Sequence, residues 1–103
     1  MKRGDIRWYR FRSPDKKRAV LVLTRDSVLA YLDEVTVAPV TSTVRDIPSE
    51  VLLTQDDGMK GNCAVNLDHI QTVSRKRIGR RITALSWEKI LQVRRAIRFA
   101  LDL

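Results

Sequence analysis

The stretch "KKRAVLVLTRD", residues 16–26, decides the fold. In its centre, residues 18–24, every side chain after Arg18 is apolar or β-branched. Such a run is typical of a strand that is buried on both faces, so it predicts a central strand of a sheet. Three bases, Lys16, Lys17 and Arg18, stand directly at its start. The sequence therefore places dense positive charge at the N-terminal end of a strand that is predicted to be buried.

Further strands are predicted on both sides of this run. They cover residues 6–11, 34–41, 50–54 and 63–73, the last being one long bent strand or two joined strands. Pro39 has no N–H to donate, so it should lie where its strand ends or faces an edge. Residues 26–33 fit one or two helical turns capped by Asp26, or an ordered loop. Residues 13–15 predict a turn, residues 56–62 a loop and residues 74–81 a basic loop.

The last element is predicted to be a helix. Ser86 is its N-cap candidate, and apolar residues recur at helical spacing at Ile90, Val93, Ile97 and Leu101. About five to seven short strands without long helices between them predict a mostly β (α+β) domain. We expect a compact antiparallel sheet or small barrel, capped by the C-terminal helix.

Length and composition predict one domain spanning residues 1–103, with 44% hydrophobic and 31% charged residues. No apolar run approaches the roughly 20 residues that span a bilayer, and the N-terminus has no signal-peptide pattern. One cysteine, Cys63, excludes an internal disulfide. A cytoplasmic protein that does not associate with membranes is the expectation, and a dimer would compensate for the modest core.

Positive charge is concentrated in two segments. The net charge is +8, residues 1–18 hold eight bases and two acids, and "RKRIGRR", residues 75–81, holds five bases and no acid. Residues 26–57 hold seven acids and one base. Clustering of this kind predicts a polyanionic or acidic partner, although the sequence alone does not show whether the two basic segments meet.

Most catalytic motifs are missing. The sequence contains no phosphate-binding P-loop, no nucleophile elbow, and no convincing metal-ligand cluster; Cys63, Asp68 and His69 are too few and too irregularly spaced. His69 is the only histidine, which excludes a two-histidine ribonuclease mechanism and leaves a single base, a ligand contact or a structural role open.

Arginine and hydroxyl chemistry remains possible. Guanidinium groups match phosphate oxygens, and fixed donors can stabilise the charge of a phosphodiester transition state. RNA carries its own nucleophile, the 2′-hydroxyl, so no metal or cofactor is required. Arg18 at a strand start and "TST", residues 41–43, at a strand end are candidate donors. A solvated basic rim is the alternative interpretation of these residues.

The ordered segments "KRGDI" (2–6), "RAVLVLTRD" (18–26), "VAPVTST" (37–43), "GMKGNCAVNLDHIQTVSRKRIG" (58–79) and "LSWEKILQVRRAI" (85–97) resemble the MazF/PemK family of toxin endoribonucleases. The order, spacing and total length of these segments carry the resemblance, which covers nearly the whole chain. It implies an SH3-like barrel of the CcdB/MazF type with a C-terminal helix. It also implies a homodimer that cleaves single-stranded mRNA at short sequences without metal, leaving a cyclic phosphate and a 5′-hydroxyl. A MazE-like antitoxin with an acidic tail is the implied inhibitor.

The resemblance also implies roles for individual residues. The family's catalytic arginine falls on Arg18 and its catalytic threonine on Thr41. The acid–glutamine pair that helps to read bases falls on Asp68 and His69. The remaining predicted RNA contacts are Arg12, Lys16, Lys17, Ser42, Arg75, Lys76 and Arg77.

Three features depart from the family pattern. Ala19 replaces the usual proline, the first loop is short, and His69 replaces glutamine, which changes the hydrogen-bond donors offered to a base. Two other functions therefore stay open: a non-catalytic CcdB-like gyrase poison and a basic nucleic-acid-binding barrel.

Overall fold

The computed structural model describes residues 1–11 and 16–103, so the predicted turn at 13–15 and the predicted RNA contact Arg12 lie outside the described residues. The elements in chain order are β1 (Asp5–Arg10), β2 (Lys17–Val22), α1 (Asp26–Leu29), β3 (Glu34–Thr41), β4 (Glu50–Leu53), η1 (Gln55–Asp57), β5 (Cys63–Asn66), η2 (Leu67–His69), β6 (Gln71–Ser74), η3 (Arg75–Arg77), β7 (Ile78–Ala84) and α2 (Trp87–Leu101).

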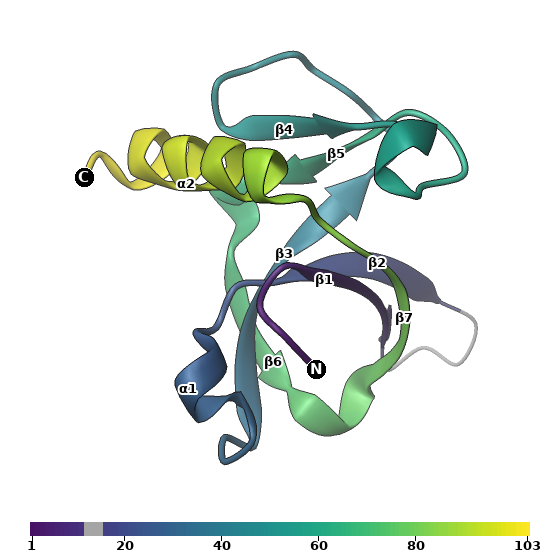
Figure 1. Ribbon diagram of the computed structural model, residues 1–103, viewed down its shortest axis with the longest axis vertical. Coiled ribbons are helices and arrows are strands. Elements are labelled where there is room, and N and C mark those ends of the chain that lie inside the picture. The colour runs from purple at the N-terminus through teal and green to yellow at the C-terminus, as the bar shows by residue number, and fades with distance from the viewer. Residues whose placement is uncertain (12–15) are drawn as a thin grey trace.

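One curled antiparallel sheet contains the seven described strands in the order β4-β5-β3-β2-β1-β7, with β6 pairing with β3 beside β5 (Figure 1). The helix α2 lies along β4 and β5, while α1 lies at the other end of the sheet, near β6. This arrangement confirms the predicted small antiparallel β domain with a C-terminal helix, and the sheet curls into a half-barrel.

The prediction for β2 is confirmed by the two sides of the sheet. Val20 and Val22 belong to a core cluster with Leu29 and Val35, whereas Leu21 belongs to a second cluster on the opposite face. Each of these three β2 side chains is at most 1% exposed. The continuous apolar run is therefore explained by burial on both faces.

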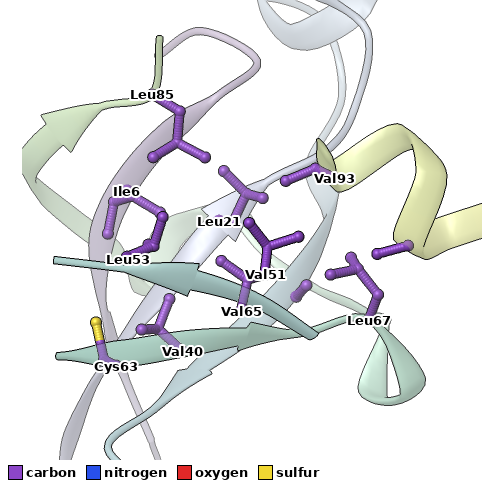
Figure 2. Close-up of a cluster of buried hydrophobic side chains, with 12 residues drawn as sticks. Ile6, Leu21, Val40, Val51, Leu53, Cys63, Val65, Leu67, Leu85 and Val93 are labelled. Carbon is purple, nitrogen blue, oxygen red and sulfur yellow. The ribbon is translucent and has the colours of Figure 1, made fainter. Parts of the chain in front are cut away.

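The second and larger cluster fills the space between the sheet and α2. Figure 2 shows Val93 of α2 reaching toward Leu21, Val51 and Val65, with Cys63 at the edge of the cluster.

Burial raises the pKa of the Cys63 thiol above its ordinary value of 9.0, and the negative charge of Asp57 adds to this effect. The thiol is therefore a packing group rather than a nucleophile.

Pro39 lies in a central strand, at a break between two ladders. The ladder from β3 to β6 ends at Val37, and the ladder to β5 begins at Val40. A proline is tolerated there because no partner strand faces it on that side. The prediction that Pro39 lies where its strand ends or faces an edge holds only in that Pro39 faces no strand on this side; β3 continues to Thr41 and is a central strand.

Two predicted boundaries are corrected. Residues 78–81, assigned to a basic loop, begin strand β7, which pairs with β1. The prediction failed because this strand is largely exposed to solvent and rich in bases, so it lacks the alternation of apolar and polar residues that indicates a strand. The short helix α1 forms, but its N-cap is Arg25; the carboxylate of Asp26 instead accepts a hydrogen bond from the N–H of Arg3 at 2.7 Å.

The other boundaries follow the sequence. Residues 63–73 form two strands joined by η2. Within the predicted loop at 56–62, η1 is closed by a capping box between Thr54 and Asp57. The hydroxyl of Ser86 accepts from the N–H of Lys89 at 3.2 Å, which confirms the N-cap of α2. Leu101, in contrast, is 55% exposed, so the apolar stripe of α2 leaves the core before its last turn.

Candidate active site and nucleic-acid interface

Strand register places Arg18 and Thr41 on one face of two adjacent strands. The ladder between β2 and β3 ends at the pair Val20–Pro39, and Arg18 and Thr41 each lie two residues beyond it. Side chains two residues apart on a strand point to the same side. Both functional groups therefore project from the face of Val20, where the two strands leave the core.

Aromatic side chains surround the guanidinium of Arg18. Arg18 pairs with Tyr9 across β1 and β2, and its Cζ lies 6.0 Å from the centroid of the Phe11 ring. The rings of Tyr9 and Phe11 meet edge to face with their centroids 4.8 Å apart. A guanidinium over an aromatic face is attracted by the ring quadrupole, so Phe11 helps to orient an exposed cation.

The segment that follows Thr41 is held by its own hydrogen bonds. The hydroxyl of Thr41 accepts from the N–H of Thr43 at 3.1 Å, and the N–H of Arg45 donates to the carboxylate of Glu50 at 2.8 Å. The Thr41 hydroxyl keeps its own proton for donation elsewhere, because in this contact it acts as an acceptor. Ser42 lies between these contacts and is exposed.

Asp68 and His69 lie in η2, which connects β5 to β6 and contacts β3 beside the ladder break. Buried Asn66 caps this turn: its Oδ1 accepts from the N–H of Asp68 at 2.9 Å, and its Nδ2 lies 3.4 Å from Nδ1 of His69. The hydroxyl of Ser49, 2% exposed, donates to the Asp68 carboxylate at 2.6 Å. Both side chains of the pair are thus held by buried polar partners while remaining exposed.

Asn66 points toward the same side of the sheet as Thr41. Thr41 pairs with Ala64, and Asn66 lies two residues farther along β5 on the same face. The sheet therefore presents Arg18, Thr41 and the turn of Asp68 and His69 on one side, which we call the Arg18–Thr41 face.

The basic residues of η3 and the first hairpin have different surroundings. Arg75 donates through its guanidinium to the carbonyl of Leu29 and is half-buried. Arg77 donates to the carbonyl of Arg10 at 3.2 Å, which joins the two basic segments of the sequence in space. Lys16, Lys17 and Lys76 are exposed.

Sequence reasoning missed Phe11, Ser49 and Asn66. A local signal for Asn66 was present, because asparagine is a favoured N-cap residue and Asn66 precedes the turn of Asp68 and His69. Phe11 lies on the same face as Tyr9. Its proximity to Arg18 depends on the register between β1 and β2, which the sequence alone does not reveal. Ser49 carried no local signal, because its bond to Asp68 spans 19 residues.

The described residues contain no group of three or more His, Cys, Asp or Glu side chains arranged to hold a metal ion. None of the described helices is long and apolar enough to cross a membrane.

Residues 2–101 match the model of a family described as PemK-like, MazF-like toxins of type II toxin–antitoxin systems. The chain belongs to the MazF/PemK toxin family. It is 39% identical over 89 residues, 86% of each chain, to endoribonuclease MazF3 of Mycobacterium tuberculosis.

Solved structures of MazF proteins have the same fold. The toxin MazF-mt6 of Mycobacterium tuberculosis matches with a TM-score of 0.88 and 36% identity, covering 96% of this chain and 97% of that one. A mycobacterial endoribonuclease, solved in complex with its cognate antitoxin, matches with a TM-score of 0.88 at 21% identity, covering 100% of this chain and 96% of that one. The fold expected from the sequence is thereby confirmed.

Proposed function

We propose that this MazF/PemK toxin is a metal-independent endoribonuclease that cleaves single-stranded mRNA at short sequences. The supporting observation is the placement of Arg18 and Thr41 on one face of adjacent strands, in a family whose relatives include named endoribonucleases. The net charge of +8 favours a polyanionic substrate.

The proposed reaction is a transesterification within the RNA. The 2′-oxygen attacks the adjacent phosphorus, the bond from phosphorus to the 5′-oxygen breaks, and a 2′,3′-cyclic phosphate and a 5′-hydroxyl result. The proton lost by the 2′-hydroxyl balances the one gained by the leaving 5′-oxygen. Arg18 relays a proton and balances phosphate charge, and Thr41 donates a hydrogen bond to the scissile phosphate.

Base recognition is assigned to Asp68 and His69, which Ser49 and Asn66 hold in place. Unpaired bases expose their Watson–Crick edges, and a carboxylate beside an imidazole offers acceptors and one variable donor. The additional proposed RNA contacts are Arg12, Lys16, Lys17, Ser42, Arg75, Lys76 and Arg77.

Cleavage of a long mixed-sequence RNA in the presence of EDTA tests this proposal. Discrete cuts should appear, and Thr41→Val and Arg18→Ala should each reduce the rate by about 100- to 1,000-fold, the usual cost of losing one transition-state donor. Thr43→Val, on the neighbouring exposed position, is the control. Unchanged RNA together with gyrase-dependent growth arrest would instead identify a gyrase poison, and salt-sensitive binding without cuts a nucleic-acid-binding protein.

We also propose that the toxin is a cytoplasmic homodimer inhibited by a MazE-like antitoxin whose acidic tail occupies the RNA-binding surface. Family membership supports the antitoxin. Large apolar side chains that α2 and the C-terminus leave exposed support a second copy: Trp87, Phe99, Leu101 and Leu103 are 55–76% exposed. Sedimentation showing a monomer at micromolar concentration would contradict the dimer.

Residues 1–103 are proposed to act as one domain, because strands of a single sheet carry both core clusters. A single cooperative unfolding transition, observed by two spectroscopic probes, tests this proposal.

A further inference from the structure

We propose that a cationic groove along β1, β2 and β7 binds the phosphates of RNA beyond the cleaved linkage. This inference rests on the proposed function, since it assumes an RNA substrate. The groove is a recess of about 880 Å³, and the residues that matter in its lining are Trp8, Arg10, Lys17, Lys76, Arg77 and Arg80. Neither Arg18 nor Thr41 lines it.

Strand alternation directs the hairpin cations of this groove away from the Arg18–Thr41 face, although Tyr9, the cross-strand partner of Arg18, also lines the groove. Arg10 pairs with Lys17, and Trp8 pairs with Ala19, which packs against the larger core cluster. Arg18 lies between Lys17 and Ala19, so its side chain leaves the strand on the opposite face. The first hairpin thus carries cations on both faces, and only one face belongs to the proposed catalytic pair.

A β-bulge forms the far wall of the groove. Arg7 pairs with Arg81 and Tyr9 with Ile78, so Trp8 faces two residues of β7 instead of one. Bulges redirect side chains, and here the extra residue brings Arg80 to the recess that Arg10 lines.

The charge of the groove has no acidic counterpart in its lining. Five cations line it, and none of the described residues that line it is an acid. Arg10, Lys17, Lys76 and Arg80 are exposed, whereas Arg77 reaches across to the Arg10 carbonyl. Gathering like charges disfavours the folded chain, and a polyanion that releases its counterions on binding removes that repulsion.

The lining favours RNA over an acidic protein segment. Three of the five cations are arginines, whose planar donors match phosphate oxygens in pairs. The half-buried indole of Trp8 offers a surface on which a base can stack. Lys17 and Tyr9, both in the groove lining, are the chain neighbour and the cross-strand partner of Arg18, so an RNA strand held at Arg18 can continue into the groove.

The test compares two RNAs once the cut site has been mapped. One contains only the cleaved sequence, and the other extends it by several nucleotides on both sides. The wild type should cleave the extended RNA with about tenfold higher kcat/KM, and the double variant Arg10→Gln/Arg80→Gln should lose this preference. For the extended RNA, the plot of the logarithm of the binding constant against the logarithm of salt concentration should be less steep for the double variant than for the wild type. The slope should differ by about 1.4, because each lost contact to a single-strand phosphate removes about 0.7.

The control is Lys60→Gln/Arg95→Gln, which removes two charges from exposed positions outside the groove and should retain the preference. The proposal would be refuted if both double variants lost the preference for the extended RNA equally, or if the wild type showed no such preference. Stronger binding of a poly-glutamate peptide than of the extended RNA, lost in the groove variant, would assign the groove to an acidic protein and also overturn the proposal. If the wild type cleaves neither RNA, the proposed nuclease function fails, and binding of the same RNAs still tests the groove.

Discussion

Replacement of Ser49 by alanine tests how the structure holds the turn of Asp68 and His69. The Ser49 hydroxyl is buried and donates to the Asp68 carboxylate at 2.6 Å. A hydrogen bond to a charged group contributes about 1.5–3 kcal/mol, but Asp68 is exposed and water can replace the lost donor. We therefore expect Ser49→Ala to lower the free energy of unfolding by about 1–2 kcal/mol. For a domain of this size, that change lowers Tm by about 5–15 °C.

Urea denaturation of Ser49→Ala, Asp68→Asn and the double variant measures the coupling between the two side chains. The double variant should be less destabilised than the sum of the single variants by about 1 kcal/mol, because each single change already breaks the same bond. Ser27→Ala, at an exposed position of α1, is the control and should change stability by less than about 0.5 kcal/mol. Strict additivity of the two changes would refute the reasoning.

The same variant also has a readout in RNA cleavage. If Asp68 reads a base, a carboxylate released from Ser49 should accept additional sequences while the best site is still cut. Mapping cuts in a long RNA for the wild type and Ser49→Ala at a temperature where both are folded checks this expectation. An unchanged cut pattern would show that Ser49 stabilises the fold without affecting base recognition.

Three further changes have defined outcomes. Phe11→Leu should lower kcat about two- to fivefold, since an exposed cation–π contact of about 0.5–1 kcal/mol orients Arg18; a loss as large as that of Arg18→Ala would contradict this. Because the folded-state pKa of Cys63 is raised, the thiol stabilises the fold below pH 9 and this contribution is lost at higher pH; the fall in Tm between pH 8 and 10 should be smaller in Cys63→Ala, and equal falls would argue against it. Gly58→Ala should destabilise by about 1–3 kcal/mol in urea, because φ is +93° and the new Cβ would lie 2.4 Å from Oγ1 of Thr83, whereas exposed Gly61→Ala, with an open Cβ position, is the control and should have little effect.

Local patterns predicted the strands whose burial is regular. The run at 18–24 reads as a central strand because both of its faces are covered, and the Ser86 cap fixes the start of α2. The pattern failed for β7, where edge position and exposure remove apolar alternation. Strand prediction from one sequence is thus most reliable where the core dictates each side chain.

The candidate site was predictable only in part. Residue chemistry offered Arg18 and residues 41–43 as candidate donors, and the family resemblance singled out Arg18 and Thr41. Their shared face depends on a register that connects residues far apart in sequence. The bond from Ser49 to Asp68 and the meeting of the two basic segments are likewise long-range. Such contacts follow from strand order, which local periodicity does not encode.

The ladder break at Pro39 has a consequence for how this toxin could acquire new targets. On one side of the break, Arg18 belongs to the hairpin of β1 and β2; on the other, β4, β5 and η2 carry the turn of Asp68 and His69. Substitutions in the latter unit can alter which sequence is selected without altering the strand that supports the guanidinium. Under the proposed roles, base preference can therefore drift through η2 alone, whereas changes in β5 also reach the cleaving pair, because Thr41 pairs with Ala64.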